Sequence, residues 1–455
     1  MSNLLARHIA QTEISDRIRS SIEAIPVSVP RISTIKQLLT SLDSFADEMT
    51  GFFKDGFAPT PNVSYRLVKS PSKSEEFVYG RIADRVNYDL DVIHRAFGQR
   101  YIDQSSTRFS EKVGNRLQIA DSLAMRALQL IRSKQNQTEM TTSVLTYCQR
   151  YLRTRVLPYT RVAPLAIPMS ALRYDLDLTA IAHEVGHHAY RYLELYQPTT
   201  LKQFMNTEHA LPSMLKAWME EIFADVYGGL IAGPLILTCF MEFALQTPDK
   251  WFAADDGQHP PPMLRPYIYI DLLSKLSQRL GIDLGDMAAS KTDWTRKVNE
   301  RGYNDNTPLD SGGSNPDLLL NTLTMGEAQE KIASLTDNIL DYFAPTAQDQ
   351  WWMPISNWNT FSSMSEVIEQ VGNWEPIQLD DVSTQARQDA FESYVVDNPD
   401  KDEGVSTVGE ILAAAGNEIP VREWMKILSF GDWVEVVQRA NCSRYVTLRQ
   451  RCWPL

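Results

Sequence analysis

The chain has 455 residues, of which 43% are hydrophobic and 22% charged, so it can bury a large core and is neither fibrous nor largely disordered. Its 44 Lys and Arg against 57 Asp and Glu give a net charge of −13, which disfavours nucleic acid and anionic membrane surfaces as principal partners. The cysteines Cys148, Cys239, Cys442 and Cys452 form no CxxC pair and are too scattered for a disulfide framework. They suit a reducing compartment, so we expect a cytoplasmic protein.

Neither a secretory signal nor a membrane span is expected. Charged and polar residues interrupt every apolar stretch near the N-terminus. The longest uncharged run, residues 226–241, contains three glycines and a proline and is shorter than the ~20 apolar residues that cross a bilayer.

Helical periodicity dominates residues 1–150. Apolar residues three and four apart follow Ser33 and predict a helix that ends near Gly51, and the same spacing predicts a helix over residues 117–131. A third series, beginning at Val144 and ending at Leu152, is also interpreted as a helix. Prolines predict a loop over residues 57–74. We therefore expect a helical N-terminal domain over residues 1–150.

Residues 156–169 are apolar but contain three prolines, which cannot donate to a strand ladder, so this segment is predicted to be an edge strand. An edge strand beside an active site can pair with an extended peptide, and Leu165→Asp would then raise the KM for peptides. Helices follow to about Leu280, where Gly281 can end the last one. A loop over residues 301–317 and a helix over residues 318–343 complete a predicted domain of residues 151–343.

The remaining residues, 344–455, are expected to form a C-terminal accessory region. Trp351, Trp352 and Trp358 lie among prolines and predict a linker that packs back onto the body. Mixed helix and loop are expected after Thr360, with an acidic break over residues 397–403.

Five of the seven histidines lie between residues 183 and 259, and the segment His183-Glu-Val-Gly-His187 is an HExxH motif. Because helical residues four apart share one face, His183 and His187 can bind one metal ion. Glu184 lies beside them, where it can take a proton from a water whose pKa zinc lowers and then give it to the leaving amine. A chance match on a surface helix is the alternative, but small and apolar neighbours favour a buried helix whose polar groups bind zinc.

A catalytic zinc needs a third protein ligand, and a later apolar segment supplies a candidate. Glu221 and Asp225 lie four residues apart in that segment, where like charges repel unless both serve one ion. We expect Glu221 to be the third ligand and Asp225 to accept the free ring N–H of His183. The alternative is that Glu220, Glu221 and Asp225 form a solvent-facing acidic edge.

A third element is His259, followed by three prolines and Arg265. The prolines hold His259 outside a helix, and either His259 or Arg265 can donate to the oxyanion that forms when water attacks an amide. The alternative is a helix N-terminus with proline in its first turn and Arg265 in a structural ion pair. Two further histidines are not expected to bind the metal. His188 points away from the ligand face and is interpreted as a supporting or structural residue instead of a fourth ligand, and His209 is expected on the surface.

These motifs resemble those of the gluzincin metallopeptidases, in which HExxH is followed by ExxxD. They are most similar to the family of the CAAX-prenyl endopeptidase and the bacterial heat-shock membrane protease, where HExGH, ExxAD and HPP with an Arg six residues after its His recur. The matching residues here are His183-Glu184-Val-Gly186-His187, Glu221-Ile-Phe-Ala224-Asp225, and His259-Pro260-Pro261 with Arg265. The resemblance covers residues 155–285 and implies His183, His187 and Glu221 as zinc ligands and Glu184 as the catalytic carboxylate. That family is membrane-embedded and this chain lacks its long apolar helices, so its role with hydrophobic peptides is not implied.

The sequence thus predicts a mainly α (α+β) protein, a bundle-like helical body with a small, edge-strand-containing sheet beside a gluzincin-type zinc site. Its predicted function is that of an endopeptidase with one Zn²⁺ per chain and a restricted protein or peptide substrate. A regulatory protein could bind the N-terminal or C-terminal region, and the N-terminal helices could form a lid. The alternatives are a zinc-stabilised binding scaffold without turnover and a coincidence of motifs. Glu184 favours the enzyme, because a structural zinc site has four protein ligands and no use for a base.

Overall fold

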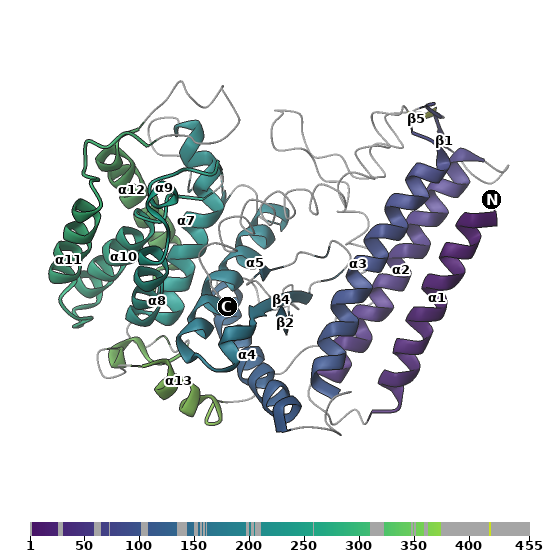
Figure 1. Ribbon diagram of the computed structural model, residues 1–455, viewed down its shortest axis with the longest axis horizontal. Coiled ribbons are helices and arrows are strands. Elements are labelled where there is room, and N and C mark those ends of the chain that lie inside the picture. The colour runs from purple at the N-terminus through teal and green to yellow at the C-terminus, as the bar shows by residue number, and fades with distance from the viewer. Residues whose placement is uncertain are drawn as a thin grey trace.

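Helices make up most of the described chain in this computed structural model, and a three-stranded sheet lies near its middle (Figure 1). The predicted mainly α class with a small sheet is confirmed. The structure describes residues 2–25, 31–58, 65–71, 73–101, 108–133, 143–149, 153–154, 157, 160, 162–196, 200–201, 204, 211–257, 259–309, 323–346, 349, 352–358, 363–374 and 418–419. His209, Trp351 and the acidic segment 397–403 lie outside these residues.

Three long helices form an N-terminal bundle (Figure 1): α1 (Ser2–Glu23), α2 (Ile32–Phe57) and α3 (Glu75–Tyr101). The helix predicted to end near Gly51 instead continues to Phe57, because Phe52, Phe53 and Phe57 extend its buried stripe. The predicted loop after it contains β1 (Arg66–Leu67), which pairs in parallel with β5 (Glu418–Ile419).

The three-stranded sheet contains β2 (Ser143–Gln149), β3 (Arg153–Thr154) and β4 (Val162–Pro168). The helix predicted from Val144 onward is wrong, because residues 143–149 form β2 and pair in parallel with β4; Tyr151 and Leu152 lie outside the described residues. A short apolar run does not distinguish a buried strand from a buried helix by its periodicity. Here both faces of β2 are buried, as is usual for a parallel strand.

The prediction that residues 156–169 contain an edge strand is also wrong within the described residues, because β4 lies between β2 and β3. The prolines are accommodated because β3 pairs only with Leu165 and Ala166, between Pro164 and Pro168. Leu165 is fully buried, so Leu165→Asp would destabilise the fold instead of reporting on substrate binding.

A helical body follows the sheet. The short turns η2 (Met169–Leu172) and η3 (Asp175–Thr179) connect β4 to α5 (Ala180–Tyr196). The remaining elements are α7 (Ser213–Ala232), α8 (Pro234–Leu245), α9 (Asp249–Phe252), α10 (Arg265–Leu280), α11 (Met287–Glu300), α12 (Met325–Phe343), η5 (Ile355–Asn357) and α13 (Met364–Val371). As predicted, Gly281 ends α10 in the left-handed conformation, at φ +65°.

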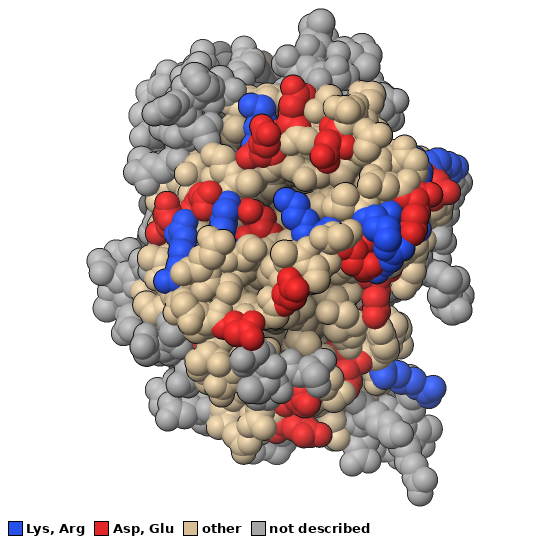
Figure 2. All heavy atoms as spheres, turned by 90° about the vertical axis from the view of Figure 1, so that its left-hand side faces the viewer, with Lys and Arg blue, Asp and Glu red and all other residues tan. Residues whose placement is uncertain are grey.

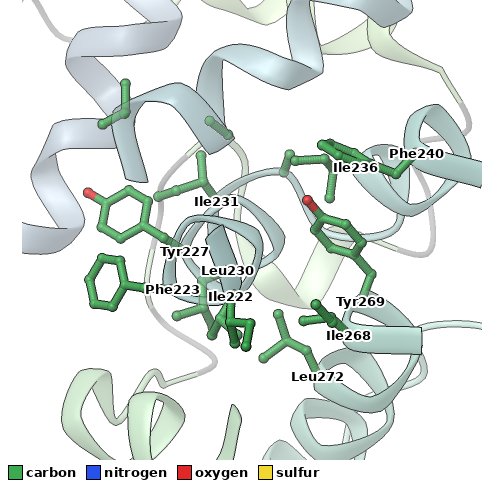
Figure 3. Close-up of a cluster of buried hydrophobic side chains, with 14 of the residues drawn as sticks. Ile222, Phe223, Tyr227, Leu230, Ile231, Ile236, Phe240, Ile268, Tyr269 and Leu272 are labelled. Carbon is green, nitrogen blue, oxygen red and sulfur yellow. The ribbon is translucent and has the colours of Figure 1, made fainter. Parts of the chain in front are cut away.

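Helix α7 lies at the centre of this body and is apolar nearly all round, as expected of a buried helix. Figure 3 looks along α7: Ile222 lies near Ile268 and Leu272 of α10, whereas Phe223 and Tyr227 point to the opposite side. There both rings pack against Phe343 of α12. Because α7 carries Glu221 and Asp225, this packing buries both carboxylates.

The buried hydrophobic side chains form two clusters that meet at the sheet. The first, called here the bundle core, joins α1, α2 and α3 to one face of the sheet through residues such as Leu145 and Ala166. The second, the body core, begins in α4 (Arg108–Ser133) and includes the alternating residues Val144 and Leu165. Helix α4 therefore packs with the body, although the predicted N-terminal domain includes it.

The segment after α12 returns to the body, as predicted. Trp352 is buried and donates its indole N–H to the carbonyl oxygen of Leu123 in α4, at 2.8 Å. Trp358 is also buried and lies against Gly233, where a Cβ would come within 2.7 Å of the indole ring.

Charged side chains of both signs alternate over the face of the molecule that carries α11 and α12 (Figure 2). Ion pairs such as Lys275–Asp337 and Lys297–Asp293 account for part of this pattern. Among the described helices, none has the length and apolar character needed to cross a membrane.

Candidate metal centre

The candidate site lies where α5 crosses α7, and small residues allow the two helices to approach closely. A Cβ on Gly186 would come within 2.8 Å of the Cα of Ala224, and a Cβ on Gly228 within 3.1 Å of the His183 backbone nitrogen. The Gly186 distance is shorter than real Cβ contacts, and the Gly228 distance is tighter than most of them, so glycine at both positions allows this close crossing. The close crossing brings the side chains of the HExxH helix against Glu221.

Three candidate ligands converge on one point. The Nε2 atoms of His183 and His187 lie 3.0 Å apart, and the Glu221 carboxylate lies 3.3 Å from His187 Nε2 and 3.5 Å from His183 Nε2. Two atoms bound to one tetrahedral zinc are roughly 3.3 Å apart, given bond lengths of ~2.0–2.1 Å. Glu221 Oε2 is buried and accepts no hydrogen bond among the described residues, although Arg265 Nη2 lies 3.5 Å from it and 3.3 Å from His183 Nε2. The residues therefore fit a zinc ion.

Glu184 lies beside this group. Ligand atoms of His183, Glu184 and His187 all lie within 4.8 Å of one another, and Glu184 is buried. A carboxylate at this distance can act on a water between itself and the two imidazoles.

A buried carboxylate holds His183. Asp225 Oδ1 lies 3.0 Å from His183 Nδ1 and accepts hydrogen bonds from the Tyr269 hydroxyl at 2.6 Å and from Arg265 Nη2, while Arg265 Nε donates to Asp225 Oδ2 at 2.9 Å. Burial alone lowers the pKa of His183, but its hydrogen bonds to Asp225 and Glu221 outweigh that effect and raise the pKa to about 9. Asp225 is fully buried and Glu221 nearly so, which shows that the solvent-facing acidic edge is wrong.

His187 has a matching partner that the sequence interpretation missed. Its Nδ1 lies 3.2 Å from Glu220 Oε1, and Arg191 donates to both oxygens of Glu220, at 3.1 and 2.5 Å. A signal was present, because Arg191 follows His187 by one helical turn and Glu220 directly precedes Glu221. The sequence did not reveal that α5 and α7 lie close enough for the pair to form.

His259 approaches the third candidate ligand. Its Nε2 lies 3.0 Å from Glu221 Oε1 and its Nδ1 2.7 Å from Asp256 Oδ2, outside any helix. Burial alone lowers the pKa of His259, but the Glu221 and Asp256 carboxylates outweigh it and hold the pKa well above its ordinary value. Asp256 was not predicted, although its place three residues before His259 allows a local turn in which it also accepts the His259 backbone N–H.

Arg265 is the first residue of α10, with Pro266 in the first turn and Leu264 as the N-cap. Its ion pair with Asp225 matches the structural alternative, and through Asp225 it also supports His183. His188 is buried, and neither ring nitrogen has a hydrogen-bond partner among the described residues.

The site as a whole carries an excess of negative charge. The five carboxylates of Glu184, Glu220, Glu221, Asp225 and Asp256 outnumber by two the three cations beside them, which are Arg191, Arg265 and the protonated ring of His259. With His183 and His187 neutral, as metal ligands must be, a divalent cation would balance this excess.

In comparisons with known proteins, no protein-family model, no curated protein and no solved structure matches the chain.

Proposed function

We propose that the chain is a zinc-dependent metalloendopeptidase of the gluzincin type, with His183, His187 and Glu221 as ligands of one zinc ion. The observation that carries the proposal is the convergence of two imidazole nitrogens and one carboxylate at 3.0–3.5 Å, with Glu184 beside them. Three protein ligands leave a position open for water or substrate, which is typical of a catalytic zinc and not of a structural one.

Bound zinc would act as a Lewis acid that lowers the pKa of water and polarises the substrate carbonyl. Glu184 is the general base in this proposal: it takes a proton from the attacking water and gives it to the nitrogen of the broken peptide bond. Its position supports this role, because a carboxylate within 4.8 Å of both imidazoles can reach a water bound between them.

The contacts of His259 and Arg265 indicate what these two residues do in the proposed site. Each donates to a carboxylate, His259 to Glu221 and Arg265 to Asp225. These contacts support roles in which the two residues hold the ligand set in place. Stabilisation of the oxyanion by either residue stays a prediction.

The proposed substrate is an extended peptide or protein segment. Strands β3 and β4 contact α5, and β3 is the outer strand of the described sheet on that side. Main-chain pairing of substrate is therefore proposed for β3 in place of β4. A restricted substrate, a regulatory partner and a cytoplasmic location stay predictions from the sequence.

A zinc-stabilised scaffold without turnover is the second candidate function. The same three ligands would serve it, by joining α5 to α7. Glu184 argues against it, because a scaffold gains nothing from burying a carboxylate within 4.8 Å of the two imidazoles.

The test measures zinc content and peptide-library cleavage for wild type, His183→Ala and Glu184→Gln. We expect about one zinc per chain in wild type and Glu184→Gln, little in His183→Ala, and cleavage by wild type alone. Zinc without cleavage under any condition would favour the scaffold. A wild-type protein that binds no zinc would refute both functions.

A further inference from the structure

We infer that Glu220 and Arg191 form a positioning pair for His187, which sets how tightly and how long the protein retains its metal. The inference rests on the proposed zinc site and adds to it two residues that the motifs do not include. The evidence for it is the set of contacts among His187 and Arg191 of α5 and Glu220 of α7.

The position of the proton on the His187 ring decides which of its nitrogens can bind metal. A neutral imidazole has one N–H and one lone pair, so it binds metal through Nε2 only if Nδ1 carries the proton. Nδ1 lies 3.2 Å from Glu220 Oε1, whereas Nε2 lies 3.0 Å from His183 Nε2 and 3.3 Å from Glu221. Glu220 thus selects the tautomer whose lone pair faces the ligand group, and it also fixes the ring orientation.

Glu220 is itself held in place by Arg191. Arg191 donates from Nε and Nη2 to its two oxygens, and this bidentate geometry fixes the plane of the carboxylate. Arg191 lies one turn beyond His187 on α5, while Glu220 lies on α7. The pair therefore ties the two helices together where His187 must face Glu221.

The Glu220–Arg191 pair is more exposed than its counterpart at His183, the Asp225–Arg265 pair. Asp225 and Arg265 have side chains that are 0% and 5% exposed, whereas Glu220 and Arg191 are 25% and 18% exposed. Water and chelators therefore reach the His187 side more easily. We expect His187 to release the metal first, and the Glu220–Arg191 pair to slow that release.

The experiment uses the full-length protein and compares wild type with Glu220→Ala, Glu220→Gln, Arg191→Met and the Glu220→Ala/Arg191→Met double variant. Zinc Kd is measured by competition with a chromogenic chelator, zinc release by mixing with excess chelator, and Tm on metal-free protein. Glu300→Gln is the matched control, because it removes a carboxylate from an exposed Arg–Glu pair on α11, away from the site.

Glu220→Ala is expected to raise the zinc Kd about 10- to 100-fold, mainly through faster release. Glu220→Gln should have a smaller effect, because its amide oxygen can still accept the Nδ1–H of His187. Arg191→Met should weaken binding in wild type but add little in the Glu220→Ala background, since it acts through Glu220. Glu300→Gln should match wild type.

An unchanged zinc Kd and release rate in Glu220→Ala, with or without a lower metal-free Tm, would overturn the inference and leave the proposed function intact. Equal effects of Arg191→Met in both backgrounds would overturn the part assigned to Arg191. A wild-type protein without zinc would overturn the inference together with the function on which it rests.

Discussion

Gly186→Ala tests the close crossing of α5 and α7 with the addition of a single methyl group. The new Cβ would lie 2.8 Å from the Cα of Ala224, which is about 0.6 Å closer than the 3.4 Å at which ordinary contact begins. The atom it meets is backbone, so the helices themselves must move apart. The same movement carries His183 and His187 away from Glu221 and widens the present 3.3 and 3.5 Å separations toward ~4 Å, beyond the roughly 3.3 Å that suits tetrahedral zinc.

The expected loss of unfolding free energy is about 1–3 kcal/mol, the usual cost of adding a methyl group to a well-packed core. Zinc affinity should fall at least about tenfold, because ligand geometry is disturbed as well as stability. Urea denaturation of the metal-free protein measures the first effect, and chelator competition measures the second.

Two glycines provide matched controls. Gly51 in α2 and Gly80 in α3 lie within helices, and a Cβ on either would meet nothing within 4 Å. Alanine at these positions should stabilise the protein by up to about 1 kcal/mol without changing zinc affinity. If Gly186→Ala behaved like these controls in both measurements, the argument from the close crossing would be refuted.

Three further predictions concern stability. Burial lowers the pKa of His188 to about 4, so below pH ~6.5 the unfolded chain takes up a proton that folded His188 does not, and this group alone should cost metal-free protein about 2 kcal/mol by pH 5. The cost is measured as the change in unfolding free energy between pH 7 and pH 5 in urea titrations, compared between wild type and His188→Leu, with exposed His94→Gln as control. The same change in wild type and His188→Leu would contradict it. Arg265→Met leaves the buried Asp225 carboxylate without the guanidinium that pairs with it and should lower the unfolding free energy by about 3–5 kcal/mol. Arg279→Met, in a partly exposed ion pair, should lower it by less than about 1 kcal/mol, and equal losses in the two variants would mean that burial does not set the cost. Trp352→Ala should lower the unfolding free energy by about 3–5 kcal/mol, and a loss below about 1 kcal/mol would mean that its segment does not belong to the body core.

The candidate ligands could be predicted because their arrangement is largely local. Two histidines one helical turn apart share a face whatever surrounds the helix, and so do Glu221 and Asp225. The helix end at Gly281 was equally local, since glycine readily adopts a positive φ.

Contacts between distant segments could not be predicted in the same way. The Glu220–Arg191 pair depends on how closely two helices cross, and the contact of His259 with Glu221 depends on where a separate loop lies. Likewise, β2 is buried on both faces and shows no clean alternation of apolar and polar residues, so only its pairing with β4 distinguishes a strand from a helix. Pro164 indicated an edge, but it could not reveal that its neighbours pair with a strand of only two residues.

The position of the sheet between the bundle core and the body core also has a consequence for unfolding. Leu145 and Ala166 belong to one core and Val144 and Leu165 to the other, so neither core can open without exposing a face of the same two strands. The protein should therefore melt in one cooperative transition, with the backbone amides of β2 and β4 among the last to exchange with deuterium. Because β4 continues through η2 and η3 into α5, residues 162–187 would make up the foldon that holds the HExxH helix in register with the rest of the chain.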